Sequence, residues 1–286
     1  MGHERIGVLP KSQQWRDVVQ LIASLQMSEI EVSDIVIKTI QNVRSRFRYI
    51  CRDEGVIAAF KFLIALSVAS RSPHPRENLS VLGIDVPENP SLLSLAKSVH
   101  LWVSLKQESL EYSQIAQSAT VDAIVDWYNQ NKTGQGLLFE SMDTGFEVWR
   151  KAGTGAGFCE LARLFFAKFT ERYLNYFLER EASAYLWSIN EREEFGEQLE
   201  EYVDEISQYA FETAKITQSF AAGWFNKHAS EGIPPNDEDI ESFLWLAFGK
   251  IREELSADRV AIVKSRRDLT IASARTSGLL REGEEK

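Results

Sequence analysis

Residues 56–69 read VIAAFKFLIALSVA and form the longest apolar stretch of the chain. Lys61 interrupts the stretch, which is shorter than the about 20 residues that a membrane-spanning helix needs. Its large side chains, among them Phe60, Leu63 and Leu66, would cover most of the circumference of a helix. A helix that is apolar all round is surrounded by protein, so we expect a central core helix here.

Helical spacing of apolar residues continues on both sides of this stretch. Before it, we expect one helix over residues 12–26 and a second over residues 28–50. The second helix has an apolar seam formed by Val36, Ile40, Val43, Phe47 and Ile50. After the core helix, residues 72–90 contain four prolines and predict a loop with one short helical turn near Leu79.

The second half of the chain shows the same periodicity, and no stretch alternates long enough to predict a strand. Helices are expected at 91–103, 109–128, 147–151, 158–187, 188–228 and from Asn236 or Asp237 towards Arg267. Three pairs have the spacing of a capping box, which marks a helix start: Ser28 and Glu31, Thr144 and Glu147, and Ser188 and Glu191.

These patterns predict an all-α fold. We expect a globular bundle of about eight to ten helices, with one long helix in the C-terminal half and no significant sheet. Glycines near residue 155 suggest a boundary between an N-terminal helical region, 1–145, and a C-terminal helical region, 146–269. Residues 270–286 have few large apolar side chains and predict a flexible tail.

The rare residue types limit the possible chemistry and the compartment. Two cysteines supply neither a disulfide framework nor a zinc site, which favours a reducing compartment. The first residues lack the apolar core of an export signal, so we expect a cytoplasmic protein without a transmembrane segment. The four histidines have no metal-ligand spacing, and we expect neither a metal nor a cofactor.

Charge is distributed unevenly along this acidic chain, whose net charge is −10. Residues 1–76 carry 11 basic and 7 acidic residues, whereas residues 140–210 carry 7 basic and 15 acidic ones. The chain is therefore electrically polarised, with a basic start and an acidic middle.

Arginines repeat every four residues at Arg44, Arg48 and Arg52, and Arg46 adds to them. On a continuous helix, the three would share one side and could bind phosphates of nucleic acid, of a lipid head group or of a nucleotide. They would equally suit an acidic partner. The other interpretation is a solvated face that is paired with acids such as Asp53 and Glu54.

Glycines at 153, 155 and 157 precede a helix. Their backbone amides could bind an anion, but the run lacks the third glycine of a dinucleotide-binding loop and the lysine of a phosphate-binding loop. A hinge or a close crossing of helices is the better interpretation of Gly153, Gly155 and Gly157. Cys159 follows in the first helical turn, where a lowered pKa would favour a thiolate; a core thiol is the alternative.

Carboxylates are concentrated between residues 191 and 205. This acidic stretch either stabilises a helix N-terminus or docks a basic partner, such as the basic start of another copy. The docking residues would be Glu193, Glu194, Glu197, Glu200, Glu201, Asp204 and Glu205. An aromatic stripe on the preceding helix favours a core rather than a ligand pocket, and its members are Phe165, Phe169, Tyr173 and Tyr176.

Without a catalytic motif, the sequence favours a non-enzymatic interaction subunit, an adaptor or sensor in an intracellular assembly. Its partner would be another protein or a second copy of the chain. A protein that binds nucleic acid or anionic lipid through the arginines is the alternative, and an enzyme that uses Cys159 is the third hypothesis. Residues 149–181 and 210–228 resemble uncharacterised bacterial helical proteins encoded near anti-phage defence genes, and this resemblance implies a bacterial assembly in such defence.

Overall fold

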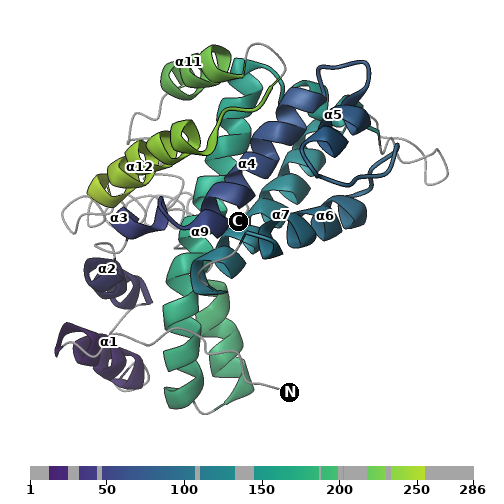
Figure 1. Ribbon diagram of the computed structural model, residues 1–286. Coiled ribbons are helices and arrows are strands. Elements are labelled where there is room, and N and C mark those ends of the chain that lie inside the picture. Colours follow the sequence, from purple (N-terminus) through teal and green to yellow (C-terminus); the bar gives the residue numbers. More distant parts are fainter. Residues whose placement is uncertain are drawn as a thin grey trace, which may run out of the picture.

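The computed structural model describes residues 13–24, 32–43, 47–106, 110–132, 145–186, 188–198, 202, 218–229 and 233–254. Within these residues the chain forms helices and no strand, which confirms the all-α bundle (Figure 1). The helices are α1 (Gln13–Ser24), α2 (Val32–Val43), α3 (Phe47–Ile50), α4 (Glu54–Ala69), α5 (Pro75–Val81), α6 (Leu92–Ser104), α7 (Leu110–Asn131), α8 (Glu147–Arg150), α9 (Gly155–Tyr185), α11 (Gln218–His228) and α12 (Asp237–Glu254). Residues 189–198 are helical as well.

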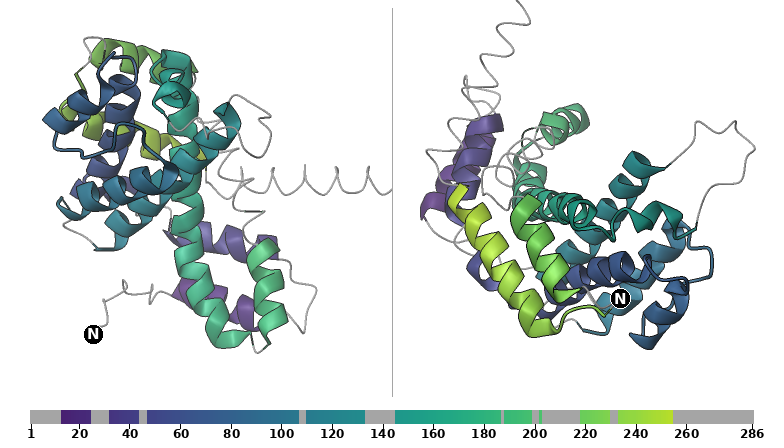
Figure 2. Two further views of the ribbon diagram at one scale, coloured as in Figure 1. Left: turned by 90° about the vertical axis from the view of Figure 1, so that its right-hand side faces the viewer. Right: turned by 90° about the horizontal axis from the view of Figure 1, so that it is seen from above.

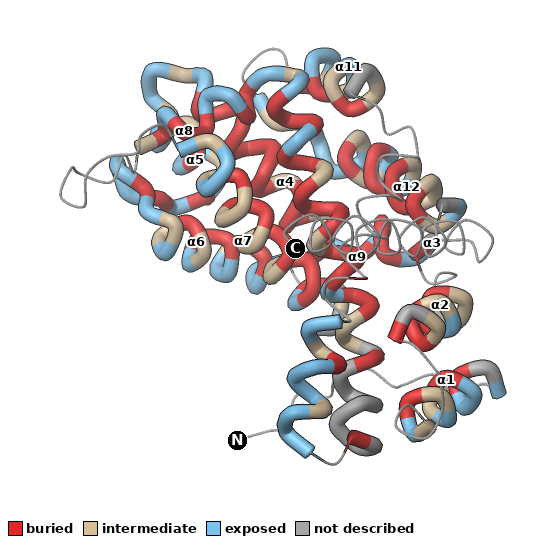
Figure 3. Tube along the Cα trace, turned by 180° about the vertical axis from the view of Figure 1, so that it is seen from behind, coloured by how far each residue is buried: buried red, intermediate tan, exposed pale blue. Residues whose placement is uncertain are grey.

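Helix α4 is the central core helix that the apolar stretch predicts. Asp53 caps its start, because a carboxylate oxygen accepts from the backbone N–H of Val56 at 3.1 Å. Most of its residues are buried, as the tube coloured by burial makes visible (Figure 3). Helices α5, α6, α7, α9 and α12 pack around it.

Helix α9 is the longest described helix, with 31 residues. Helix α11 lies beside its N-terminal part, and α7 reaches its middle, where Asp122 pairs with Arg172. Helices α1 and α2 and residues 189–198 lie around its C-terminal end (Figure 2). The predicted aromatic stripe is confirmed as core, because Phe165, Phe169 and Tyr173 are fully buried and Tyr176 is half-buried.

Aromatic rings fill the space where α4, α9 and α12 meet. The Phe60 ring of α4 stacks on Phe243 of α12 at 5.5 Å between centroids. It also contacts three rings of α9, with centroid distances of 5.1 to 6.0 Å, namely Phe158, Phe165 and Phe166. Such ring pairs add favourable edge and stacking contacts to the burial of apolar area.

Two side chains fix the short helix α8 to its neighbours. The indole N–H of Trp127 donates to the carbonyl of Val148 at 3.1 Å, and the Ser70 hydroxyl donates to the carbonyl of Trp149 at 2.8 Å. Both donors are buried, so these bonds satisfy carbonyls that have no water nearby. Helix α8 is thereby joined to both α7 and α4.

Two of the predicted helix caps are observed at the starts of described helices. Ser188 and Glu191 form the predicted capping box, since each backbone N–H donates to the side chain of the other. Asn236 caps α12 through a 2.8 Å bond from the Asp239 N–H. Thr144, the first residue of the second predicted box, lies outside the described residues, and the N-cap residue of α8 is Phe146, which has no side-chain cap bond. Ser28 lies outside the described residues.

Other predictions fall partly or wholly outside the described residues. The long helix over 188–228 is described only at 189–198, at Tyr202 and in α11, so its continuity stays a prediction. The boundary near residue 145 and the tail 270–286 also stay predictions. The buried residues that are described form one cluster that includes both α4 and α9.

Candidate functional site

The glycines before α9 allow a close approach of backbones. A methyl group added to Gly153 would lie 2.8 Å from the Ser67 carbonyl oxygen of α4, and one on Gly157 would lie 1.9 Å from the Lys151 carbonyl oxygen. The amide of Gly157 donates to the Thr154 hydroxyl at 3.0 Å. Because this amide already donates to a cap at the helix start, the close crossing of helices is favoured over an anion-binding loop. A hinge at Gly153, Gly155 and Gly157 stays a prediction.

The structure describes only part of the predicted arginine ladder. Arg44 and Arg46 lie outside the described residues, and Arg48 is described by its backbone alone. Helix α3 ends at Ile50, so Arg52 lies in the turn before α4 instead of on a continuing helix. Arg52 is exposed, and its Nε lies 3.7 Å from a carboxylate oxygen of Glu241. This pairing with an acid fits the interpretation of a solvated face.

Three residues of the predicted acidic docking face are described. Glu193, Glu194 and Glu197 are exposed, while Phe195 between them is buried. Glu200, Glu201, Asp204 and Glu205 lie outside the described residues. We define the acidic face as Ile189, Glu193, Glu194 and Glu197, since Ile189 is also exposed and lies four residues before Glu193.

Cys159 is a buried core residue. Burial raises the pKa of its thiol, and the neighbouring Glu160 adds to the rise. His100 and His228, which could in principle serve as a base for a thiol, have other partners: His100 contacts Gln117, and His228 pairs with Asp239 at 3.3 Å. A raised pKa disfavours the thiolate that a nucleophile needs. In the described part of the chain, no group of three or more acidic, histidine or cysteine side chains could hold a metal ion.

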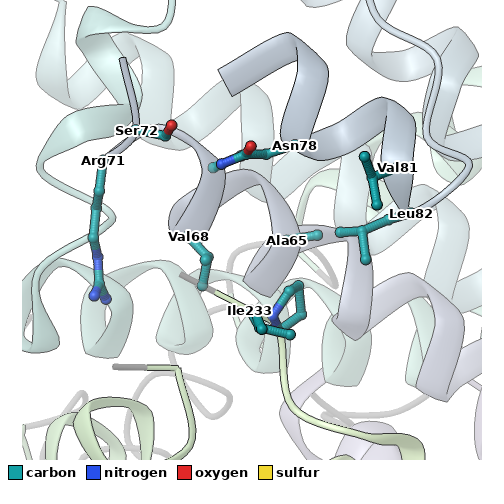
Figure 4. Close-up of a pocket in the computed structure, with 10 residues that line it drawn as sticks. Ala65, Val68, Arg71, Ser72, Asn78, Val81, Leu82 and Ile233 are labelled. Atoms are coloured by element: carbon teal, nitrogen blue, oxygen red, sulfur yellow. The ribbon is translucent and has the colours of Figure 1, made fainter. Parts of the chain in front are cut away.

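A cleft lies between the end of α4, helix α5 and residues 233–234, with a volume of about 640 Å³. We call it the Arg71 cleft. Apolar side chains form most of its lining, together with three polar ones (Figure 4). The lining residues are Ala65, Val68, Ala69, Arg71, Ser72, Asn78, Val81, Leu82, Ile233 and Pro234. Volumes of this size are typical of small-molecule sites.

The Arg71 guanidinium is held by neutral groups. It lies over the Phe225 ring, 4.6 Å from the ring centroid, and one nitrogen donates weakly to the Ala229 carbonyl at 3.4 Å. Among the described residues no carboxylate lies within ion-pair distance of Arg71, and partial burial lowers the pKa of Arg71. Arg71 is thus an exposed arginine without a carboxylate partner in the described part of the chain.

A second, charged cleft of about 340 Å³ lies where α4 and α6 meet α12. Lys61, the charged residue of the apolar stretch, forms a 2.6 Å ion pair with Asp237 at the start of α12. Arg52 and Glu241 form the second ion pair at this cleft. Four of the seven charged residues that line this cleft form these two ion pairs, and its volume is about half that of the Arg71 cleft.

Helix α6 presents leucines to the outside. Leu93, Leu101 and the C-cap residue Leu105 are 81%, 52% and 79% exposed, on the side opposite the buried Leu95, Val99 and Val103. Lys97 lies between the first two at the same four-residue spacing. We call Leu93, Lys97, Leu101 and Leu105 the α6 face.

The sequence reasoning missed both the Arg71 cleft and the α6 face. The leucines at positions 93, 101 and 105 repeat at multiples of four residues, on the side opposite the stripe that faces inwards, and this second stripe was a usable signal. Arg71 gave no local signal, because its neighbours Ala229 and Ile233 are distant in the sequence.

Comparisons with known proteins give no family for this chain: no family model, no curated protein and no solved structure matches it. Across the helices that the structure describes, none combines the length and the apolar character needed to cross a bilayer.

Proposed function

We propose that the chain is a non-enzymatic interaction subunit, an adaptor or sensor in a cytoplasmic assembly, and that the α6 face is its docking surface. Bacterial anti-phage defence is the setting that the resemblance of its helices implies. The observation that carries the proposal is the row of exposed leucines on α6. Leucines gathered on one exposed helix face are typical of protein interaction sites, since water solvates them poorly.

The charge of the α6 face selects the chemistry of the partner. Helix α6 contains no acidic residue, while Lys97 lies within the leucine row and Lys106 follows the helix. An amphipathic helix with apolar and acidic side chains would therefore fit the α6 face, with its carboxylates near the lysines.

The acidic face of a second copy has this chemistry. Ile189, Glu193 and Glu197 follow each other at intervals of four residues, so they share one side of the helical segment 189–198. Their net charge is opposite to that of the α6 face. We therefore name a second copy of this chain as the first partner of the α6 face.

The two faces lie in different parts of the molecule. Helix α6 belongs to the upper body in Figure 1, whereas residues 189–198 lie beside the C-terminal end of α9 (Figure 3). Contact between two different surfaces closes into a ring or a reciprocal dimer, or extends into a chain of subunits. The molar mass in solution distinguishes these arrangements.

Size-exclusion chromatography with light scattering tests the proposal over a range of protein concentrations and salt. We expect a mass above that of one chain, and a loss of association in high salt because the contact is partly ionic. Leu101→Lys is expected to give a monomer. Trp245→Lys is the matched control, since Trp245 is an exposed apolar residue on α12, outside both faces.

A charge exchange makes the test specific. Lys97→Glu and Glu193→Lys should each weaken association of the variant with itself, whereas a mixture of the two variants should restore it. A wild-type chain that stays monomeric at every concentration would overturn the second copy as partner. Association that is equally strong in Leu101→Lys would overturn the α6 face as the contact.

A further inference from the structure

We propose that the Arg71 cleft is a binding site for a small organic anion, with an anionic head group at Arg71 and a short apolar body along α4 and α5. This site is separate from the α6 face and does not depend on self-association. The proposal combines a cation that has no carboxylate partner among the described residues, an apolar wall and a cavity of suitable volume at one place in the fold.

The first argument is the state of the Arg71 charge. A guanidinium carries five N–H donors in one plane, and a carboxylate or phosphate can accept two of them side by side. Among the described residues, the partners of the guanidinium are the Ala229 carbonyl, through one long bond, and the face of Phe225. An anion beside Arg71 would meet guanidinium N–H groups that have no acceptor among the described residues.

The second argument is the position of Arg71. Its side chain packs between two elements, because its Cγ lies 2.6 Å from where a methyl group on Gly153 would stand and its guanidinium lies over Phe225 of α11. A guanidinium that is already ordered loses less conformational entropy when it binds an anion.

The third argument is the apolar wall. Ala65 and Val68 of α4 face Leu82 across the cleft, and its rim exposes Val81 at 87% and Ile233 at 66%. An apolar body of a ligand would shield both rim residues from water, which is favourable in proportion to the apolar area removed. An inorganic anion would leave this surface exposed.

Polar and apolar groups occupy different ends of the cleft, which orients the ligand. Figure 4 shows the Arg71 side chain at one side of the cleft, with its guanidinium turned away from the Ser72 hydroxyl, and Val81 and Leu82 at the other side. The head group would therefore lie near the Arg71 guanidinium, and the apolar body would point towards Leu82.

Isothermal titration calorimetry of the full chain with three probes tests the proposal. The probes are octanoate, which has both parts, 1-octanol, which has no charge, and inorganic phosphate, which has no apolar body. We expect octanoate to bind at least about 10-fold more tightly than either of the other probes, as suits a charge-assisted bond in addition to apolar contact.

Two variants locate the site. Arg71→Met should reduce the affinity for octanoate by about 10-fold and should abolish its advantage over octanol. Arg76→Met is the matched control, because Arg76 lies on α5 outside the cleft. This variant should bind octanoate as tightly as the wild type does. Val81→Asp, at an exposed rim position, should weaken octanoate binding, and circular dichroism checks that each variant is folded.

Several results would overturn the inference. Equal affinity for octanoate and octanol would refute the charge contact with Arg71. Phosphate binding as tight as octanoate binding would refute the contact between an apolar ligand body and α4 and α5. No measurable octanoate binding, or octanoate binding that is unchanged in folded Arg71→Met, would exclude the Arg71 cleft as the site.

Discussion

Replacing Gly157 with alanine should destabilise the protein, although alanine is the better helix former. A methyl group at this position would lie 1.9 Å from the carbonyl oxygen and 2.6 Å from the carbonyl carbon of Lys151. Both atoms belong to the backbone, so no side-chain rotation can relieve the overlap. The turn between α8 and α9 has to open by about 1 Å or more to reach an ordinary contact distance.

The cost follows from what that turn holds. The Lys151 carbonyl accepts from the Thr154 N–H at 3.0 Å and from the Thr154 hydroxyl at 2.8 Å. Moving the carbonyl weakens both bonds, at about 1 kcal/mol each, and overpacking adds about 1–3 kcal/mol. The better helix propensity of alanine returns about 1 kcal/mol. The free energy of unfolding should therefore fall by about 2–4 kcal/mol.

Urea denaturation followed by circular dichroism measures this difference, with Gly249→Ala as the control. Gly249 lies inside α12 and has open space where a methyl group would stand, so its replacement should raise stability by about 0.5–1 kcal/mol. The two substitutions are chemically identical and are expected to act with opposite sign. If Gly157→Ala proves as stable as the wild type, the close approach at this turn is refuted.

Three further predictions concern buried groups and a cap. Trp127→Phe should cost about 1–3 kcal/mol, because a buried carbonyl loses its donor, whereas Trp245→Phe at an exposed site should change little in the same denaturation assay. Burial raises the pKa of the thiols of Cys51 and Cys159 above their ordinary 9.0, so each thiol holds its proton more firmly in the folded chain than in the unfolded one. The thiols of the unfolded chain ionise above that pH, so the free energy of unfolding should decline there in the wild type. The decline should be smaller in the double variant Cys51→Ala and Cys159→Ala. Ser188→Ala removes a helix cap and should cost about 1 kcal/mol, measured in the same way.

The sequence predicted those parts of the fold that depend on local patterns. The apolar run at 56–69 lies within α4, and Ser91 and Asn236 cap the helices that they were expected to start. In these cases the side chain acts on backbone groups three residues away, so the necessary information lies within one turn of helix.

The remaining parts depend on contacts between distant residues. Lys61 was visible as a charge in an apolar helix, but its partner Asp237 lies 176 residues later in the chain. The surroundings of Arg71 come from the end of α11 and from residues 233–234, and no local sequence pattern connects these segments to it. Arg52 was expected on a helix, but the cap of α4 at Asp53 requires extended backbone just after it.

The shell of aromatic rings around Phe60 also has a consequence for biosynthesis. Phe60 leaves the ribosome long before its partners Phe158 and Phe243, so α4 stays without its final cover while more than half of the chain is made. At typical rates of about 5–20 residues per second, that interval lasts roughly 10–40 s. The nascent N-terminal helices are therefore expected to be chaperone clients, and a chain that is truncated before α9 is expected to aggregate.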